Sequence, residues 1–124
     1  MHVRRIVNRP AILEATRACG FSDREIAGLM GVGAVFLGEC GRGERPLPAF
    51  RQVALITVVQ VLLNGIGSPP TLPKSEYAPR AQAVRRSVEH WLELAIAELG
   101  TPPAKAETRG QDLAIQMLDR LEAQ

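Results

Sequence analysis

Apolar residues recur every three or four positions through most of this chain of 124 residues, which is the spacing of one face of an α-helix. No segment alternates apolar and polar residues in the way that a half-buried strand requires. Six segments carry the helical pattern, and they lie at residues 10–19, 23–30, 34–40, 48–64, 79–99 and 108–123. We therefore predict an all-α protein.

The segment at residues 22–46 predicts two short helices joined by a tight turn. Ser22 is a good N-cap, and Asp23 places a carboxylate in the first turn, where the helix dipole favours it. Ala27 is small enough to let a second helix cross closely. Gly31 stands where the chain must turn sharply, in a conformation that often needs a positive φ. Apolar contacts between the two helices are expected from Ile26, Met30, Val32, Leu37 and Cys40.

This segment resembles the helix-turn-helix of the lambda-repressor/Cro family of phage and bacterial regulators. The small, turn and apolar residues named above follow the family's spacing. The tail RGERP at 42–46 resembles the Arg-Gly-Lys-x-x-Pro tail that is common after the family's recognition helix. The resemblance covers about residues 8–64. It implies a lambda-repressor-like helix-turn-helix domain at residues 1–64, with double-stranded DNA as its partner.

The second half of the chain predicts a linker and a two-helix extension. Residues 65–78 are rich in Gly, Ser and Pro, as linkers are. Residues 79–124 carry the last two predicted helices, which we expect to form an antiparallel hairpin used for packing or dimerisation. The pattern Thr108-x-x-Gln111 is a capping box and is expected to begin the final helix.

The helix predicted at 48–64 has apolar residues on nearly all of its faces, which is typical of a helix that is buried all round. Three short helices cannot cover it completely. Its cover must come from the C-terminal helices or from a second copy of the chain. We therefore expect either tight docking of the C-terminal half or a homodimer through this helix and the C-terminal helices.

In the resembled family the third helix enters the major groove of DNA, and its first residues contact base edges. The family usually places polar residues there, whereas Ala34 and Val35 offer only apolar contact to a thymine methyl group. Glu39 can accept a hydrogen bond from cytosine, and Arg42 is the candidate for a bidentate base contact. Carried over position by position, the resemblance implies DNA contacts from Gly33, Ala34, Val35, Gly38, Glu39 and Arg42.

Arginines near this segment are candidates for contacts with DNA phosphates. Residues 1–64 hold eight Lys or Arg against five Asp or Glu, whereas residues 65–124 hold seven against eight. The alternatives are a solvated terminus for the basic N-terminal arm, and a role for Arg42 and Arg45 in capping the preceding helix. The candidates near the predicted turn are Arg24, Arg42, Arg45 and Arg51, and those in the arm are Arg4, Arg5 and Arg9.

Other chemistry finds little support in the sequence. Cys19 and Cys40 stand at apolar positions and no Cys or His pair has metal-site spacing, so we expect two buried thiols and no metal or cofactor. We expect no enzyme, because neither a Walker motif nor a grouped set of Ser, His and Asp is found. The apolar run at 53–63 is too short to cross a membrane, and HVRRIVNRP lacks the apolar core of a secretion signal, so we expect a cytoplasmic protein.

Two hypotheses of function follow from these patterns. The first is a homodimeric, phage-like transcriptional regulator that reads an inverted repeat in DNA. The second is an interaction protein that keeps the helix-turn-helix scaffold but has lost base reading. Such an adaptor, or phage-encoded inhibitor, would bind a host protein through Ala34, Val35 and Phe36.

Overall fold

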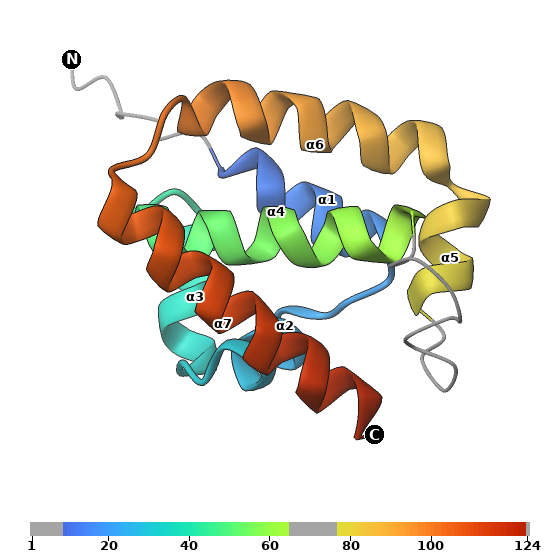
Figure 1. The fold of residues 1–124 in the computed structure, drawn as a ribbon, viewed down its shortest axis with the longest axis horizontal. Coiled ribbons are helices and arrows are strands. Elements are labelled where there is room, and N and C mark those ends of the chain that lie inside the picture. Colours follow the sequence, from blue (N-terminus) through green and yellow to red (C-terminus); the bar gives the residue numbers. More distant parts are fainter. Residues whose placement is uncertain (1–8, 65–76, 124) are drawn as a thin grey trace, which may run out of the picture.

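Every described residue in regular secondary structure is helical. The computed structural model describes residues 9–64 and 77–123. These ranges contain no strand, so the predicted all-α class is confirmed. In chain order the helices are α1 (Ala11–Ala18), α2 (Asp23–Met30), α3 (Ala34–Gly41), α4 (Ala49–Asn64), α5 (Tyr77–Ala83), α6 (Arg85–Leu99) and α7 (Ala104–Glu122) (Figure 1).

Helix α4 lies in the middle of the molecule and is covered by helices of its own chain (Figure 1). α7 packs along it, and α1, α5 and α6 contact it from other directions. Eight of its sixteen residues are buried, which explains apolar residues on nearly all of its faces. The sequence left open whether the C-terminal helices or a second copy supply the cover. The C-terminal helices supply it, so α4 itself gives no reason to expect a dimer.

The last two helices do not pack together as the predicted antiparallel hairpin. α6 runs along α1, whereas α7 packs against α4 and α2 (Figure 1). The carboxylate of Glu98 in α6 accepts a hydrogen bond from the backbone N–H of Ala11 at 3.1 Å, and so caps α1, whose N-cap Pro10 offers no side-chain acceptor. α6 is therefore tied to the N-terminal helices rather than to α7.

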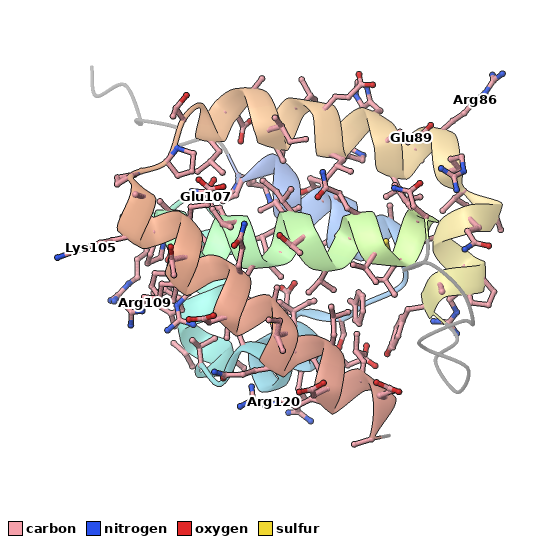
Figure 2. The ribbon with its side chains drawn as sticks, in the orientation of Figure 1. Arg86, Glu89, Lys105, Glu107, Arg109 and Arg120 are labelled. Atoms are coloured by element: carbon pink, nitrogen blue, oxygen red, sulfur yellow. The ribbon has the colours of Figure 1, made fainter. Side chains whose placement is uncertain are left out.

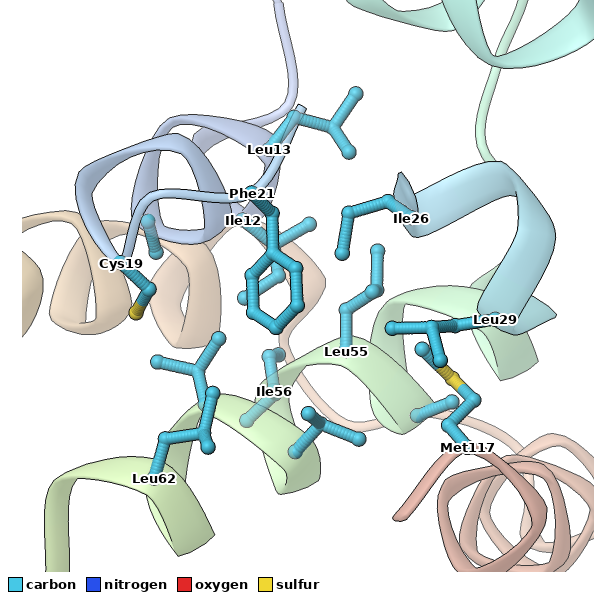
Figure 3. Packing of buried hydrophobic residues seen from close by; sticks show 14 of the residues in the cluster. Ile12, Leu13, Cys19, Phe21, Ile26, Leu29, Leu55, Ile56, Leu62 and Met117 are labelled. Carbon is cyan, nitrogen blue, oxygen red and sulfur yellow. The ribbon is translucent and has the colours of Figure 1, made fainter. Parts of the chain in front are cut away.

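One apolar core joins the two halves of the chain. Buried residues of α6 and α7, such as Val88 and Met117, belong to the same cluster as those of α1, α2 and α4. Figure 3 shows Met117 of α7 beside Leu29 of α2, and Leu55 of α4 facing Ile26 of α2. The predicted division at 65–78 thus separates segments that share a core. Residues 65–76 of that predicted linker lie outside the described residues, and 77–78 begin α5.

The long helix predicted at 79–99 is two helices, α5 and α6, which meet at Val84 (φ −116°, ψ 34°). The break brings Arg85 to the C-terminal end of α4, where it donates hydrogen bonds to the carbonyl of Leu63 and to Asn64. Gln82 donates to the carbonyl of Leu62 at 3.4 Å. Because the last carbonyls of a helix lack partners within it, these donors stabilise the end of α4.

Helix α7 begins four residues earlier than predicted. Its N-cap is Pro103, which makes no side-chain capping bond, so Thr108 and Gln111 lie inside the helix and form no capping box at its start. The extra turn lets α7 reach further along α4. Gly110 is buried at their crossing, where a Cβ atom would lie 2.5 Å from Cβ of Val53 and 2.6 Å from the carbonyl oxygen of Phe50. The two backbones therefore approach closely only because residue 110 has no side chain.

Substitution Gly110→Ala is predicted to lower the free energy of unfolding by about 1–3 kcal/mol, the usual cost of overpacking, because a backbone carbonyl cannot move aside easily. Urea denaturation measures the change. Gly28→Ala is the matched control, since an added Cβ at Gly28 has open space in the interior of α2 and should raise stability by about 0.5–1 kcal/mol. Equal effects at the two glycines would contradict the close crossing.

The junction between α1 and α2 is closed by a ring stack and a capping box. The Phe21 ring stacks on Tyr77 of α5, with centroids 3.8 Å apart. The Ser22 hydroxyl accepts from the backbone N–H of Glu25 at 3.1 Å, while the Glu25 carboxylate accepts from the backbone N–H of Ser22 at 2.8 Å. The Tyr77 hydroxyl donates to the other carboxylate oxygen of Glu25. This bond, followed by the Ser22 backbone bond, lowers the pKa of Glu25.

Substitution Tyr77→Phe is predicted to reduce stability more at pH 7 than at pH 3. A carboxyl whose pKa is lowered by folding stabilises the fold above its unfolded pKa, and this contribution disappears as the pH falls through the folded pKa. Removal of the hydroxyl takes away the largest cause of the lowered pKa while keeping the ring stack. Urea denaturation of both proteins at the two pH values measures the difference. A loss of the same size at both would contradict the Glu25 contact.

Candidate nucleic-acid interface

Helix α2 ends at Gly31, whose backbone adopts the left-handed conformation that the sequence predicted, and the chain turns there towards α3. Gly31 has φ +74° and ψ 32°. Its N–H donates to the carbonyl of Gly28 at 3.3 Å, and the N–H of Val32 donates to the carbonyl of Ala27 at 2.9 Å. These two bonds form a Schellman motif, which satisfies terminal carbonyls of α2 and reverses the chain sharply. Ala27 is buried beneath the turn, where a larger side chain would hold the helices apart.

The first turn of α3 lies in solvent. Gly33 is the extended N-cap, and Ala34 and Val35 are exposed, with 75 % of Val35 accessible. The opposite face of the helix carries Leu37 and Cys40, which are fully buried. The structure thus brings Gly33, Ala34 and Val35 together on one outward surface, which we name the α3 tip.

The charged contact residues predicted beyond the α3 tip already have ion-pair partners. Gly38 and Glu39 are half-buried, and the Glu39 carboxylate lies 3.0 Å from Nε of Arg45. Arg42 makes a bidentate pair with Glu44, at 2.7 Å from Nε and 3.3 Å from Nη2. The Glu44 hydrogen bond raises the pKa of Arg42. The alternative interpretation was that both arginines cap α3. Arg42 is its C-cap residue through the backbone N–H, which donates to the Gly38 carbonyl, but the described side-chain partners of Arg42 and Arg45 are carboxylates.

These arginine–carboxylate pairs are weak enough to exchange. The Arg42–Glu44 and Arg45–Glu39 side chains are between 29 % and 59 % exposed, and water and salt screen exposed pairs so that they contribute little to stability. A phosphate could therefore replace either carboxylate at small cost. The two acidic side chains nevertheless leave this end of α3 with little net charge.

Among the other arginines predicted to contact DNA, Arg24 is exposed and Arg9 stabilises the end of a helix. Arg24 is exposed at the start of α2, and no carboxylate of the described residues lies within ion-pair distance of it. Its neighbour Asp23 is paired with Arg17 at 3.1 Å. Arg9, expected in the basic arm, donates to the carbonyl of Gly41 and so stabilises the end of α3. Arg4 and Arg5 lie outside the described residues.

A second group of cations reaches the α2–α3 turn from α4 and α7, and of these the sequence predicted Arg51 but neither Arg109 nor Arg120. Arg51 of α4 donates to the carbonyl of Met30 at 3.4 Å, and Arg120 of α7 donates to the carbonyl of Leu29. Arg109 of α7 stacks on the Phe50 ring at 3.8 Å from its centroid. The helical repeat could have indicated Arg109 and Arg120, because a spacing of three turns places both beside the apolar stripe of α7.

The His, Cys, Asp and Glu side chains within residues 9–64 and 77–123 are dispersed. This part of the chain contains no group of three or more His, Cys, Asp or Glu residues arranged to hold a metal ion. Cys19 and Cys40 are buried and unpaired, and burial raises the pKa of the Cys19 thiol to about 11. None of the described helices combines the length and apolar character that crossing a membrane requires.

No protein-family model, curated protein or solved structure matches this chain. The resemblance to the lambda-repressor/Cro family therefore rests on the residues of the chain itself.

Substitution Gly31→Ala is predicted to lower the free energy of unfolding by about 1–2 kcal/mol, because a Cβ atom strains the left-handed conformation even where space is available. Gly28→Ala is the control: Gly28 lies inside α2 with nothing within 4 Å of an added Cβ, so alanine there should not lower stability. Thermal unfolding of both variants gives the comparison. A tolerated alanine at Gly31 would show that the turn does not need its left-handed geometry.

Proposed function

We propose that the protein binds double-stranded DNA through the α3 tip and acts as a transcriptional regulator. The observation that carries the proposal is the left-handed turn at Gly31, which leaves the first turn of α3 in solvent next to α2. Two helices joined in this way are the arrangement in which a recognition helix enters a major groove. The arginine-rich surroundings of the turn also suit a polyanion.

In this proposal the α3 tip reads bases mainly by shape and apolar contact. Ala34 and Val35 can pack against thymine methyl groups, and Arg42 is the side chain able to make a bidentate contact with a guanine after leaving Glu44. One such contact discriminates between bases by about 1–3 kcal/mol. Sequence selectivity is therefore modest, and most of the affinity comes from phosphate contacts of Arg24 and Arg45.

The proposed DNA site depends on how many copies bind. An inverted repeat needs a dimer, and the α4 surface expected to form one is covered by α1, α5, α6 and α7. A pair of half-sites would thus require contacts through another surface. A single α3 tip reads a single half-site.

A second candidate function, docking of a partner protein on the α3 tip, is favoured by two observations. Among the large apolar side chains of residues 9–64 and 77–123, Val35 is the most exposed. The arginines that follow it are neutralised by Glu39 and Glu44. An apolar patch beside balanced charges suits a protein surface better than a phosphate backbone.

Substitution Val35→Lys separates the two functions. If DNA is the partner, the new cation strengthens binding to all DNA, steepens the salt dependence by about one unit of slope and reduces selectivity. The measurement is a titration of labelled DNA from the upstream region of the protein's own gene, and of random DNA, at several salt concentrations. The unmodified protein should prefer its own region by about tenfold or more, which corresponds to one good base contact.

The matched control is Leu94→Lys, which adds the same charge at an exposed apolar residue of α6. It should leave the salt slope unchanged, because α6 packs on α1 rather than on α3. Equal gains from the two lysines would mean that net charge alone attracts the DNA. Absence of DNA binding by the unmodified protein at low salt would sink the regulator proposal and favour the protein-docking function.

A further inference from the structure

A cavity of about 350 Å³ lies where α4, α7 and the end of α2 meet. Arg51 comes from the first turn of α4, while Arg109 and Gln116 come from one face of α7. Met30, the last residue of α2, forms part of the wall, so the cavity opens beside the turn that leads into α3. Figure 2 shows Arg109 on the same side of the molecule as α3.

Two guanidinium groups share one aromatic ring in this cavity. The Cζ atoms of Arg51 and Arg109 lie 4.7 Å and 3.8 Å from the centroid of the Phe50 ring. Their separation therefore cannot exceed the sum of those two distances. Contacts with the ring and with the Met30 carbonyl orient both side chains without neutralising them.

No carboxylate of the described residues lies within ion-pair distance of either guanidinium. This sets the pair apart from Arg42 and Arg45, whose carboxylate partners are close. Asp112 lines the same cavity, one turn after Arg109, but forms no ion pair there. Burial, and secondarily the charge of Arg109, lowers the pKa of Arg51, as expected for a cation held near another.

We propose that the cavity formed by Arg51, Arg109 and Gln116 binds a phosphate group, and that its occupant in the DNA complex is a backbone phosphodiester beside the α3 tip. The second part rests on the proposed function. Guanidinium groups bind phosphate oxygens through paired, charge-assisted hydrogen bonds, and two of them on one ring are already oriented for this. The Gln116 amide adds a neutral donor. Helix α7 thereby becomes part of the DNA-contacting surface.

The test measures DNA affinity over a series of salt concentrations for the full chain. Arg109→Gln is expected to lower the slope of log affinity against log salt by about one, and to weaken binding to own-region and random DNA by the same factor. Arg109→Lys keeps the charge and should keep the slope. Asp112→Asn removes the repelling carboxylate and should tighten binding, an effect that loss of folding cannot produce.

The matched control is Arg86→Gln, which removes an exposed arginine of α6 at the opposite end of the molecule from Arg109 (Figure 2). It should leave the slope unchanged. If the unmodified protein binds DNA and Arg109→Gln has the same slope as Arg86→Gln, the DNA-phosphate role of the cavity is overturned while the proposed function stands.

A second arm uses inorganic phosphate alone and does not depend on DNA binding. At constant ionic strength, phosphate in place of chloride should raise the Tm of the unmodified protein and of Arg86→Gln more than that of Arg109→Gln. The shift that reports the site is this excess, because phosphate salts stabilise folded proteins in general. If the protein fails to bind DNA and this shift is present, the proposed function is wrong and the cavity takes a free phosphate. If the excess is absent, the phosphate site itself is overturned.

Discussion

The burial of α4 by helices of its own chain is the interaction on which the other elements depend. α7 approaches α4 closely at Gly110 and continues across α2, so the core and the α2–α3 pair are joined through one helix. α2 and α3 have eight residues each, which is too short for an isolated helix to be stable in water. The terminal carbonyls of α2 accept hydrogen bonds from Arg51 and Arg120 of the longer helices, and the Gly41 carbonyl at the end of α3 accepts one from Arg9. The exposed α3 tip is therefore held in place by packing elsewhere.

Features set by neighbouring residues were predictable from the sequence, whereas those set by distant contacts were not. The Ser22 cap and the Gly31 turn follow from local backbone chemistry, and both stand where they were expected. The spacing of apolar residues did not predict the break at Val84, because the break is stabilised by Arg85 binding the end of α4, more than twenty residues earlier. The early start of α7 was not predicted for a similar reason. Its first turn, before the capping pattern at Thr108, is stabilised by contact with α4, which lies far away in the sequence.

In the candidate site, too, features set by neighbouring residues could be predicted and those set by distant contacts could not. Exposure of Ala34 and Val35 could be predicted, since Leu37 and Cys40 had to face inward. The pairing of Arg45 with Glu39 and the approach of Arg109 to Phe50 could not, because they depend on where side chains from other turns and helices come to lie. The result is a surface with an apolar centre at the α3 tip and unneutralised arginines towards α7. Its chemistry suits backbone contact more than base-by-base reading.

Native-state hydrogen exchange measures most directly whether one core supports the whole molecule. If it does, the slowest amides of α4 and α7 exchange with the same free energy, and that value equals the global free energy of unfolding from urea denaturation. Amides of α7 that all exchange at a much lower free energy than those of α4 would make the C-terminal helix a separate appendage. That result would contradict the account, because the α3 tip and the arginine cavity both depend on α7 remaining docked.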